Sequence, residues 1–396
     1  MHASYSTRGG EDQAVNDLER EMTLRGNTVM RFSSSNDEER PITFVRAPHN
    51  RRASRRLERA IYDFRPDVIH IHNTWWTLSP TVITTATKNA ATVISLHNYR
   101  THCIAGDFLR HGKPCTKCLG KRVAAQGVAF GCYRDNIALS AQAAITSTVL
   151  HRNIRVAATA GRLLITAPTK FSADLHARGG LPQSALRVVS NLLSVDDQGT
   201  RTGTHTLDFA YVGRLSHEKG VVDLLDLWSR ARDEVPELHS ARLFIAGEGA
   251  ALESPEEVPG VVMLGRLTRQ EVLRLMARSL ALFFPSICFE NQPMTVLEAM
   301  AVGTPVIYNR GGAVDEVAGP GQPAFDLKSY DSFVDAIRLC LDPVRAARIS
   351  NEGRERVAQR YSTEVVAKGW LAVYEDAMRQ FVTHSPPMRR PEHIGE

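Results

Sequence analysis

Long apolar runs are absent from this sequence. No window reaches the roughly 18 to 20 uninterrupted apolar residues that span a bilayer, and the N-terminal segment MHASYSTRGGEDQ lacks the apolar core of a signal peptide. We therefore expect a protein of the cytoplasm. The sequence also has no internal repeat of 20 to 50 residues, and no acidic D-x-D pair stands out where a divalent metal could bind.

What is present is the composition of a globular protein. Hydrophobic residues make up 43% and charged residues 23%, which excludes a disordered or fibrous chain. A length of 396 residues is too great for one ordinary domain and favours two or three.

Positive charge is concentrated in the first half of the chain. Residues 1–200 carry 26 Lys and Arg against 16 Asp and Glu, whereas residues 201–396 carry 22 against 27. Much of the excess lies in RRASRRLERA, which predicts a helix with arginines on one side and apolar residues on the other. Such a helix can lie on an anionic lipid surface, and the alternative is the solvated face of an ordinary core helix. The arginines are Arg51, Arg52, Arg55, Arg56 and Arg59, and the apolar residues are Ala53, Leu57, Ala60, Ile61 and Phe64.

Short apolar runs alternate with helical patterns along most of the chain. Continuous apolar strands divided by amphipathic helices are typical of βαβ units, whose parallel sheets are covered on both faces. A polar stretch at 191–208 breaks the pattern where the charge changes sign, and we expect an α/β protein with two such sheets. Ligands bind outside the carboxyl ends of parallel strands, so two facing sheets imply a cleft. The runs lie at 67–72, 92–97, 163–168, 187–191, 208–213, 242–247, 261–264, 281–286 and 304–309.

A cationic loop follows one of these strands. The segment YVGRLSHEKG ends a strand with Gly213 and then supplies Arg214 and Lys219 before a helix that begins near Val221. Two cations on a Gly-bounded loop suit a phosphate or diphosphate, because Arg offers a planar fork and Lys a mobile point charge. An ordinary basic surface loop is the alternative.

Two acidic residues lie eight positions apart in FENQPMTVLEAMAVGTPVI. Glu290 precedes a helix that we expect to begin near Met294, with Pro293 in its first turn, and Glu298 lies about one turn into it. Free N–H groups at such a helix start form an anion site. A diphosphate there would leave the two acids at opposite ends of one ligand, where hydroxyl groups of a sugar and a ribose could bind them. Alone, each acid could equally be an ordinary surface residue.

The segments YVGRLSHEKG, FIAGEG, FENQPMTVLEAMAVGTPVI and GGAVDE together resemble the nucleotide-sugar half of a retaining GT-B glycosyltransferase. The similarity is to the family 4-like group that carries the E-x7-E motif. It implies two Rossmann-like domains facing each other across a cleft, with Glu290 near the donor sugar, Glu298 on the ribose, and Arg214 and Lys219 on the diphosphate. In place of the commoner E-G-F-G form this chain has ENQP, which bears on the sugar preference. Further donor contacts implied by the resemblance are Gly213, Gly265, Arg266, Asn291, Gln292, Pro293, Met294 and Thr295.

The first half contributes a glycine pair and a histidine. Gly9 and Gly10 in RGGEDQAV precede a helix and resemble the Gly-rich loop that faces the donor in these enzymes, with a plain turn as the alternative. The family normally has an apolar first strand before this loop, and here only MHASYST precedes it, so either the strand is short or the true start lies upstream. His97 occupies the position where similar enzymes place an active-site His against the donor sugar.

The segment HIHNTWW offers further candidates. His70, His72 and Asn73 are candidates for the acceptor side, although for each one structural packing is the more common role. Trp75 and Trp76 could stack on sugar or lipid or could belong to the core.

Four cysteines are spaced C-x11-C-x2-C-x13-C. In a chain without an export signal this spacing argues for a metal site rather than disulfides, and four thiolates would make a structural zinc site. An Fe–S cluster or reduced thiols are alternatives. The remaining Cys288 and Cys340 look like ordinary buried thiols. The four spaced cysteines are Cys103, Cys115, Cys118 and Cys132.

We expect a metal-independent, retaining transfer of a sugar from a UDP- or GDP-sugar to a hydroxyl acceptor. The acceptor would be a lipid-linked or polysaccharide precursor at the inner face of the membrane, with no nucleic acid partner and no cofactor needed for the chemistry. Alternatives are a nucleotide-sugar sensor or scaffold without turnover, a GT-B-type epimerase and, with less support, a phosphorylase or a dehydrogenase. The expected segments are an acceptor-side domain at 1–192 with a Cys-rich insertion at 103–132, a nucleotide-sugar domain at 193–364, a helix at 365–384 packing back on the first domain, and a disordered tail at 385–396.

Overall fold

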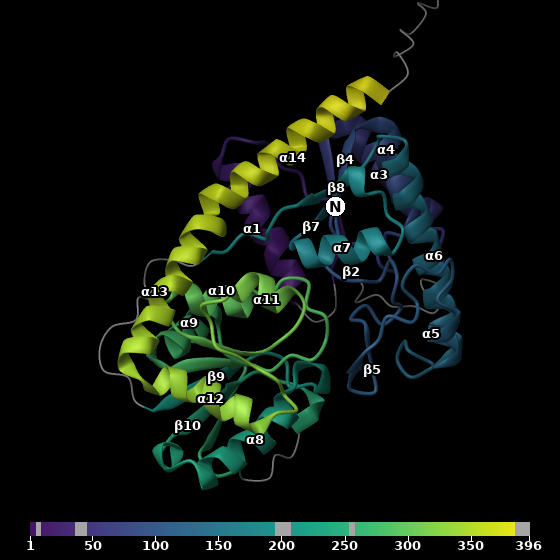
Figure 1. Ribbon diagram of the computed structural model, residues 1–396. Coiled ribbons are helices and arrows are strands. Elements are labelled where there is room, and N and C mark those ends of the chain that lie inside the picture. Colours follow the sequence, from purple (N-terminus) through teal and green to yellow (C-terminus); the bar gives the residue numbers. More distant parts are fainter. Residues whose placement is uncertain (5–8, 36–45, 195–206, 253–257, 385–396) are drawn as a thin grey trace, which may run out of the picture.

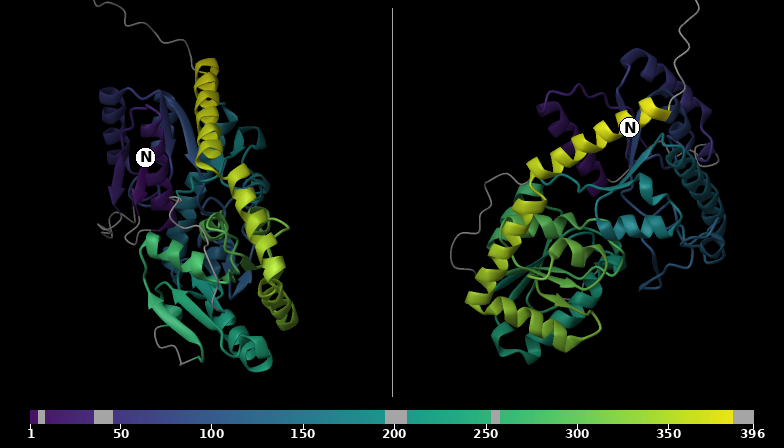
Figure 2. Two further views of the ribbon diagram at one scale, coloured as in Figure 1. Left: turned by 90° about the vertical axis from the view of Figure 1, so that its left-hand side faces the viewer. Right: turned by 45° about the horizontal axis from the view of Figure 1, so that its top comes forward.

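The computed structural model describes residues 1–4, 9–35, 46–194, 207–252 and 258–384, which form two α/β lobes (Figure 1). The tail at 385–396 lies outside the described residues, and so does most of the polar stretch in which we expected the domain boundary. Figure 2 shows the two lobes and the long C-terminal helix from two further sides.

The N-terminal lobe is built on a parallel sheet with strand order β3-β4-β7-β8. A separate parallel pair, β1-β2, meets this sheet through an isolated bridge between His2 and Asn73. The strands are β1 (His2–Ser4), β2 (Ser33–Ser35), β3 (Val68–Ile71), β4 (Ala91–Ser95), β7 (Leu164–Ala167) and β8 (Leu186–Val188). The helices are α1 (Gly10–Leu24), α3 (Arg51–Phe64), α4 (Thr81–Asn89), α6 (Ile137–Thr159) and α7 (Lys170–Arg178).

The Cys-rich insertion follows β4. It contains a small antiparallel hairpin, β5 (Leu109–Arg110) with β6 (Lys113–Pro114), and a short helix α5 (Ala125–Ala129) that packs on α6. Trp75 and Trp76 are both buried in the apolar cluster under this insertion, beside Tyr133, which is the core role given above as the alternative.

The C-terminal lobe has a six-stranded parallel sheet in the order β11-β10-β9-β12-β13-β14. Its central strands β9 and β12 are almost wholly apolar and buried, as expected of a sheet covered on both faces. The strands are β9 (Asp208–Val212), β10 (Arg242–Ala246), β11 (Val261–Gly265), β12 (Ala281–Phe284), β13 (Val306–Asn309) and β14 (Ala324–Phe325). The helices are α8 (Val221–Glu234), α9 (Arg269–Arg278), α10 (Met294–Ala301), α11 (Ala313–Ala318), α12 (Tyr330–Leu341) and α13 (Pro343–Arg360).

Helix α14 (Thr363–His384) leaves the C-terminal lobe and lies along the N-terminal one, as the yellow ribbon in Figure 1 shows. Its buried Trp370 donates a hydrogen bond from Nε1 to the Ser190 carbonyl at 3.1 Å, and it packs on Val93 of β4 and Leu164 of β7. Burial of this apolar face therefore joins the two lobes at a point away from the strand ends.

Candidate active site

The loop between β12 and α10 carries Glu290 into contact with Lys219. Lys219 Nζ lies 2.6 Å from Glu290 Oε1, and the Ser286 hydroxyl donates to the same oxygen at 2.6 Å. The two charged side chains are only 22% and 13% exposed. A pair held this closely out of water is a fixed electrostatic feature rather than a surface contact.

Burial and pairing act in opposite directions on both groups. Burial alone would raise the pKa of Glu290, but the Lys219 ammonium and the Ser286 hydroxyl hold that pKa below its usual value. Burial alone would lower the pKa of Lys219, but the Glu290 carboxylate holds that pKa above its usual value. Both partners are therefore charged at neutral pH.

A close backbone approach holds Lys219 in this place. Gly220 has φ +69°, and a Cβ added there would stand 2.1 Å from the carbonyl oxygen of Pro285, directly after β12. Only glycine fits that conformation and that contact. Arg214, at the other end of the same loop, has a side chain that is 72% exposed and lies 3.3 Å from Glu218. It is therefore accessible to a ligand.

Helix α10 begins at Met294, as the sequence predicts, with Pro293 at its N-cap. No side chain caps this end, so the first N–H groups of the helix have no side-chain partner. The helix start lies directly after the paired Glu290, which places partial positive charge beside Lys219.

Glu298, on α10, is held by an arginine that the sequence did not single out. Arg269 at the start of α9 lies 3.0 Å from Glu298 Oε1, and it also lies 3.4 Å from Asp17 of α1 in the other lobe. Burial raises the pKa of Glu298 and Arg269 opposes that rise. The two glutamates of the motif thus have separate cationic partners.

The side chains of Asn291 and Gln292 turn toward the N-terminal lobe. Asn291 Nδ2 donates to the carbonyl of Leu96 at 2.5 Å, and the Ser172 hydroxyl bonds its Oδ1. Gln292 Oε1 accepts from the Asn191 amide at 2.8 Å. The residues that distinguish ENQP from the commoner form therefore connect the two lobes.

Three further contacts cross between the lobes near this loop. The Tyr99 hydroxyl donates to the Glu290 carbonyl at 2.9 Å, and the amide of Phe289 donates to the Asp107 carbonyl at 3.3 Å. The Glu316 carboxylate accepts from the amides of Lys170 and Phe171, both at 2.8 Å, at the start of α7. The motif loop and α11 therefore both contact the N-terminal lobe.

His97 follows β4 and bonds another histidine. Its Nε2 lies 3.0 Å from His72 Nδ1, and burial lowers its pKa to about 4. Leu96, directly before it, accepts the bond from Asn291, so His97 lies beside the motif loop. His70 does not lie there. Its ring bonds the Tyr374 hydroxyl of α14 at 2.9 Å and Ser95 at 2.8 Å, which is a packing role inside the lobe.

Residues 197–356 match the model of a family described as glycosyl transferases group 1. The match covers most of the C-terminal lobe. Glycogen synthase of Mycobacterium tuberculosis is 30% identical over 203 residues, which cover 49% of this chain and 48% of that protein. The MMP alpha-(1->4)-mannosyltransferase of Mycolicibacterium hassiacum is 33% identical over 116 residues, 28% of each chain. The chain thus spans about half or less of the length of these relatives.

Solved structures extend the likeness to both lobes. Sucrose-phosphate synthase from Thermosynechococcus elongatus has a TM-score of 0.66 at 15% identity, covering 97% of this chain and 96% of that one. HepE of Anabaena, solved in complex with UDP-glucose, has a TM-score of 0.59 at 14% identity, covering 96% and 98%. At such identities the comparison concerns the fold, and the expected GT-B architecture is confirmed.

The other predicted donor contacts lie on strand ends and loops of both lobes. Gly213 ends β9, and its amide bonds the Ala246 carbonyl at 3.0 Å. Gly265 has φ +63° at the end of β11, and Arg266 after it is exposed. Across the interface, a Cβ added at Gly9 or Gly10 would meet nothing within 4 Å, so the backbone before α1 is open. The contacts of these residues with a donor stay a prediction.

Cys288 is not the ordinary buried thiol that we expected from the sequence. Its Sγ lies 3.8 Å from Glu290 Oε1 and 3.5 Å from Ser286 Oγ, and burial raises its pKa to about 12. Cys340 is 1% exposed and lies in the core.

The four spaced cysteines are free thiols. Among the described residues, no group of three or more His, Cys, Asp or Glu side chains is arranged to hold a metal ion. Burial raises the pKa of Cys132, and the nearby thiols of Cys118 and Cys115 raise it further. Cys103 packs with Tyr99 and Phe108. Leu119, directly after Cys118, packs in the same cluster as Cys103, and zinc stays a prediction.

Several residues of the site escaped the sequence analysis. Ser286, Arg269 and Tyr99 contact the two motif glutamates from three different segments. Of these three residues, only Ser286 could have been predicted from the sequence. It follows the apolar run FFP, and a polar residue just after a buried strand lies at the ligand-binding edge of a parallel sheet. The other two contacts depend on how α9 and the insertion pack.

Proposed function

We propose that the protein is a retaining glycosyltransferase that moves a sugar from a nucleotide diphosphate-sugar to a hydroxyl acceptor. The observation that carries this proposal is the Lys219–Glu290–Ser286 cluster next to the uncapped start of α10. A diphosphate bound there would meet the helix start, Lys219 and the exposed Arg214. The family model that matches most of this lobe supports the same donor class.

In this proposal the bond between the anomeric carbon and the diphosphate oxygen breaks, and the acceptor oxygen bonds that carbon on the same face. The proton of the acceptor hydroxyl passes to the departing diphosphate. Lys219, Arg214 and the α10 N–H groups stabilise the charge that develops on this leaving group, which is a form of electrostatic catalysis. Glu290 keeps Lys219 in place and lies near the sugar, and His97 faces the sugar from the other lobe.

The acceptor side has unsatisfied polar groups of its own. Glu11 Oε1, His2 Nδ1 and Arg100 Nε are buried and have no hydrogen-bond partner among the described residues. Glu11 Oε1 and His2 Nδ1 are 3.8 Å apart, too far for a hydrogen bond. Because buried polar atoms are nearly always paired, we propose that this cluster binds a hydroxyl group of the acceptor.

This cluster lies where a ligand of a parallel sheet is expected. His2 belongs to β1, and a small cavity of about 30 Å³ beyond β3 and β4 is lined by His72, His97 and Arg100 among others. Burial and the neighbouring Asp12 raise the pKa of Glu11 to about 8. A neutral carboxylic acid can both donate and accept a hydrogen bond, which matches a sugar hydroxyl.

We further propose that the acceptor is a lipid-linked or polysaccharide precursor at the cytoplasmic face of a membrane. The arginines of α3 are all exposed, while Ala53 and Leu57 on its other side are buried. None of the described helices is long and apolar enough to cross a membrane. Sedimentation with anionic and neutral vesicles tests this point, and equal binding to both would contradict it.

Structural zinc remains a proposal for the insertion. Cys115, Cys118 and Cys132 would be joined by Cys103 after a local rearrangement around Phe108. Elemental analysis of protein purified without chelator should find about one zinc per chain, the stoichiometry of one four-cysteine site. Protein that is folded and free of zinc would contradict it.

The donor experiment uses UDP-glucose and GDP-mannose as probes. We expect release of UDP or GDP from one of them, and loss of that release in Lys219→Met. Binding without release would instead favour a sensor or scaffold, and a new sugar nucleotide as product would favour an epimerase.

A further inference from the structure

One guanidinium lies between two carboxylates that come from different lobes. Arg269 Nη2 lies 3.0 Å from Glu298 Oε1, and Arg269 Nη1 lies 3.4 Å from Asp17 Oδ2. The side chains of Glu298 and Asp17 are only 16% and 8% exposed. Because both carboxylates are largely out of water, each depends on the same cation for its counter-charge.

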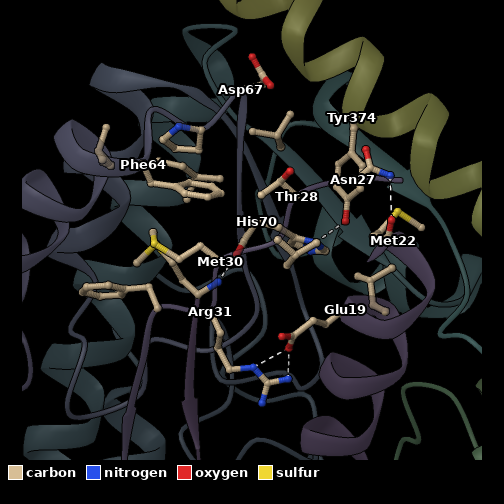
Figure 3. A pocket seen from close by; sticks show the side chains of 18 of the residues that line it. Glu19, Met22, Asn27, Thr28, Met30, Arg31, Phe64, Asp67, His70 and Tyr374 are labelled. Carbon is tan, nitrogen blue, oxygen red and sulfur yellow. Dashed lines mark hydrogen bonds and ion pairs between the residues drawn. The ribbon is translucent and has the colours of Figure 1, made fainter. Parts of the chain in front are cut away.

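Asp17 has a fixed place on α1. Gln13, one turn earlier on this helix, donates from Nε2 to Asp17 Oδ1 at 2.9 Å, so Asp17 Oδ2 is left for Arg269. Glu19 faces another side of the helix, since residues two apart on a helix do not face each other. There it accepts a hydrogen bond from Arg31 Nε at 2.6 Å, and this pair lines the cavity drawn in Figure 3. The position of α1 therefore determines how close Asp17 comes to Arg269.

Arg269 is held at the very start of α9. Thr268 caps this helix by accepting a hydrogen bond from the amide of Glu271, and the Glu271 carboxylate accepts from the amide of Thr268 in return. The Nε atom of Arg269 is buried and has no hydrogen-bond partner among the described residues. The two terminal nitrogens thus make the recorded contacts of the guanidinium, one with each carboxylate.

The two neighbours have opposite effects on Glu298. Burial raises the pKa of Glu298, Arg269 opposes that rise, and Asp17 adds to it. Among the described residues, these are the two charged groups that act on this carboxylate. Arg269 therefore favours a charged Glu298, whereas the approach of Asp17 disfavours it.

We propose that Arg269 is a positioning residue of the nucleotide site, which holds Glu298 as a charged acceptor for the ribose hydroxyls while Asp17 of the other lobe competes for the same guanidinium. Hydrogen bonds to a charged carboxylate are stronger than those to a neutral acid, so this competition sets the affinity for the ribose. The inference rests on the proposed function, because it needs a ribose at Glu298.

The test measures the Kd of UDP and of GDP by titration calorimetry between pH 5 and 8. Arg269→Met should raise the pH below which affinity is lost by about 1–3 units, and should weaken binding at pH 7 by about 10-fold. Asp17→Asn should lower that pH by a smaller amount, because it removes the competing anion. Arg269→Lys keeps the charge and should restore most of the loss. The terminal phosphate of the nucleotide titrates near pH 6 in every variant, so the differences between variants are compared.

The matched control is Arg274→Met, which removes an exposed arginine from the same helix and should leave the pH dependence unchanged. A mere loss of contact between the lobes would act alike in Arg269→Met and Asp17→Asn, so shifts of the same sign would overturn the proposal. Unchanged pH dependence in both variants would overturn it too. If Arg269→Met does not fold, Asp17→Asn decides, and a rise or no change in its pH dependence contradicts the proposal.

Failure of the proposed function gives a different result. Neither UDP nor GDP would then bind the wild type, and this inference would fall with the proposed function. Binding by the wild type together with shifts of the same sign in Arg269→Met and Asp17→Asn would overturn this inference alone.

Discussion

Removing the charge of Lys219 or of Glu290 should lower both the rate of nucleotide release and the free energy of unfolding. The effects of the two substitutions should not add. The two side chains are largely buried and 2.6 Å apart, so Lys219→Met leaves a carboxylate without its counter-charge and Glu290→Gln leaves an ammonium without one. Loss of one partner of a buried pair costs about 3–5 kcal/mol, and for Glu290→Gln this falls to about 1–3 kcal/mol, because the new amide oxygen can still accept a hydrogen bond from Lys219. The double variant should lose less than the sum, because neither charge is then left alone.

The two single variants and the double variant should lose similar amounts of activity. Each single variant should lower kcat of nucleotide release by about 10²- to 10³-fold, the effect of removing one well-placed stabilising group, and the double variant should be little worse. The stability loss of Glu290→Gln should shrink with acid. The folded pKa of Glu290 is lowered, so its contribution is present above the unfolded value of 4.5 and is lost as pH falls through the folded value.

The assay combines chemical unfolding between pH 4 and 8 with a coupled measurement of released UDP or GDP. The exposed pair Arg230–Glu234 on α8 is the matched control, and Arg230→Met with Glu234→Gln should leave both readouts nearly unchanged. Strictly additive stability losses, or full nucleotide release by Lys219→Met, would refute the reasoning.

The remaining predictions concern the acceptor side, the lobe contact and the membrane. The pKa of Glu11 is raised to about 8, so the free energy of unfolding of the wild type should fall as pH rises from 4.5 to 8, by up to about 1.4 kcal/mol per pH unit. In Glu11→Gln this dependence on pH should be weaker. Equal pH dependence of the two proteins in thermal melts would contradict this. Asn291→Ala should separate the lobes, seen as a larger radius of gyration in X-ray scattering, whereas Asn351→Ala on α13 should not. Replacing the three exposed residues Arg51, Arg52 and Arg55 by Ala should weaken binding to anionic vesicles by roughly 100-fold, about 1 kcal/mol each, while the same change at Arg345, Arg348 and Arg360 of α13 should have little effect.

Most of the fold of the C-terminal lobe could be predicted from the sequence. Continuous apolar runs became the buried strands β9 and β12, and α8 and α10 begin at Val221 and Met294 as expected. These features are local, since strand burial and helix starts are set by neighbouring residues. The contact of Lys219 with Glu290 was not predicted; it arises because both loops leave adjacent strands of one parallel sheet at the same edge.

The pairings that depend on docking could not be read from the sequence. Arg269 reaches Glu298 only because α9 and α10 pack together, and Asn291 reaches Leu96 only because the lobes meet. The same limit applies to His70, which a strand pattern placed near the acceptor but which α14 covers through Tyr374. Such contacts between side chains of different elements are set by tertiary packing, not by local preference.

A crystal structure with UDP or GDP bound tests the central claim most directly. The account predicts a diphosphate at the start of α10 within hydrogen-bond distance of Lys219 and Arg214, and a ribose whose hydroxyls bind Glu298. A nucleotide bound elsewhere, or a diphosphate with no contact to Lys219 or the α10 amides, would contradict it.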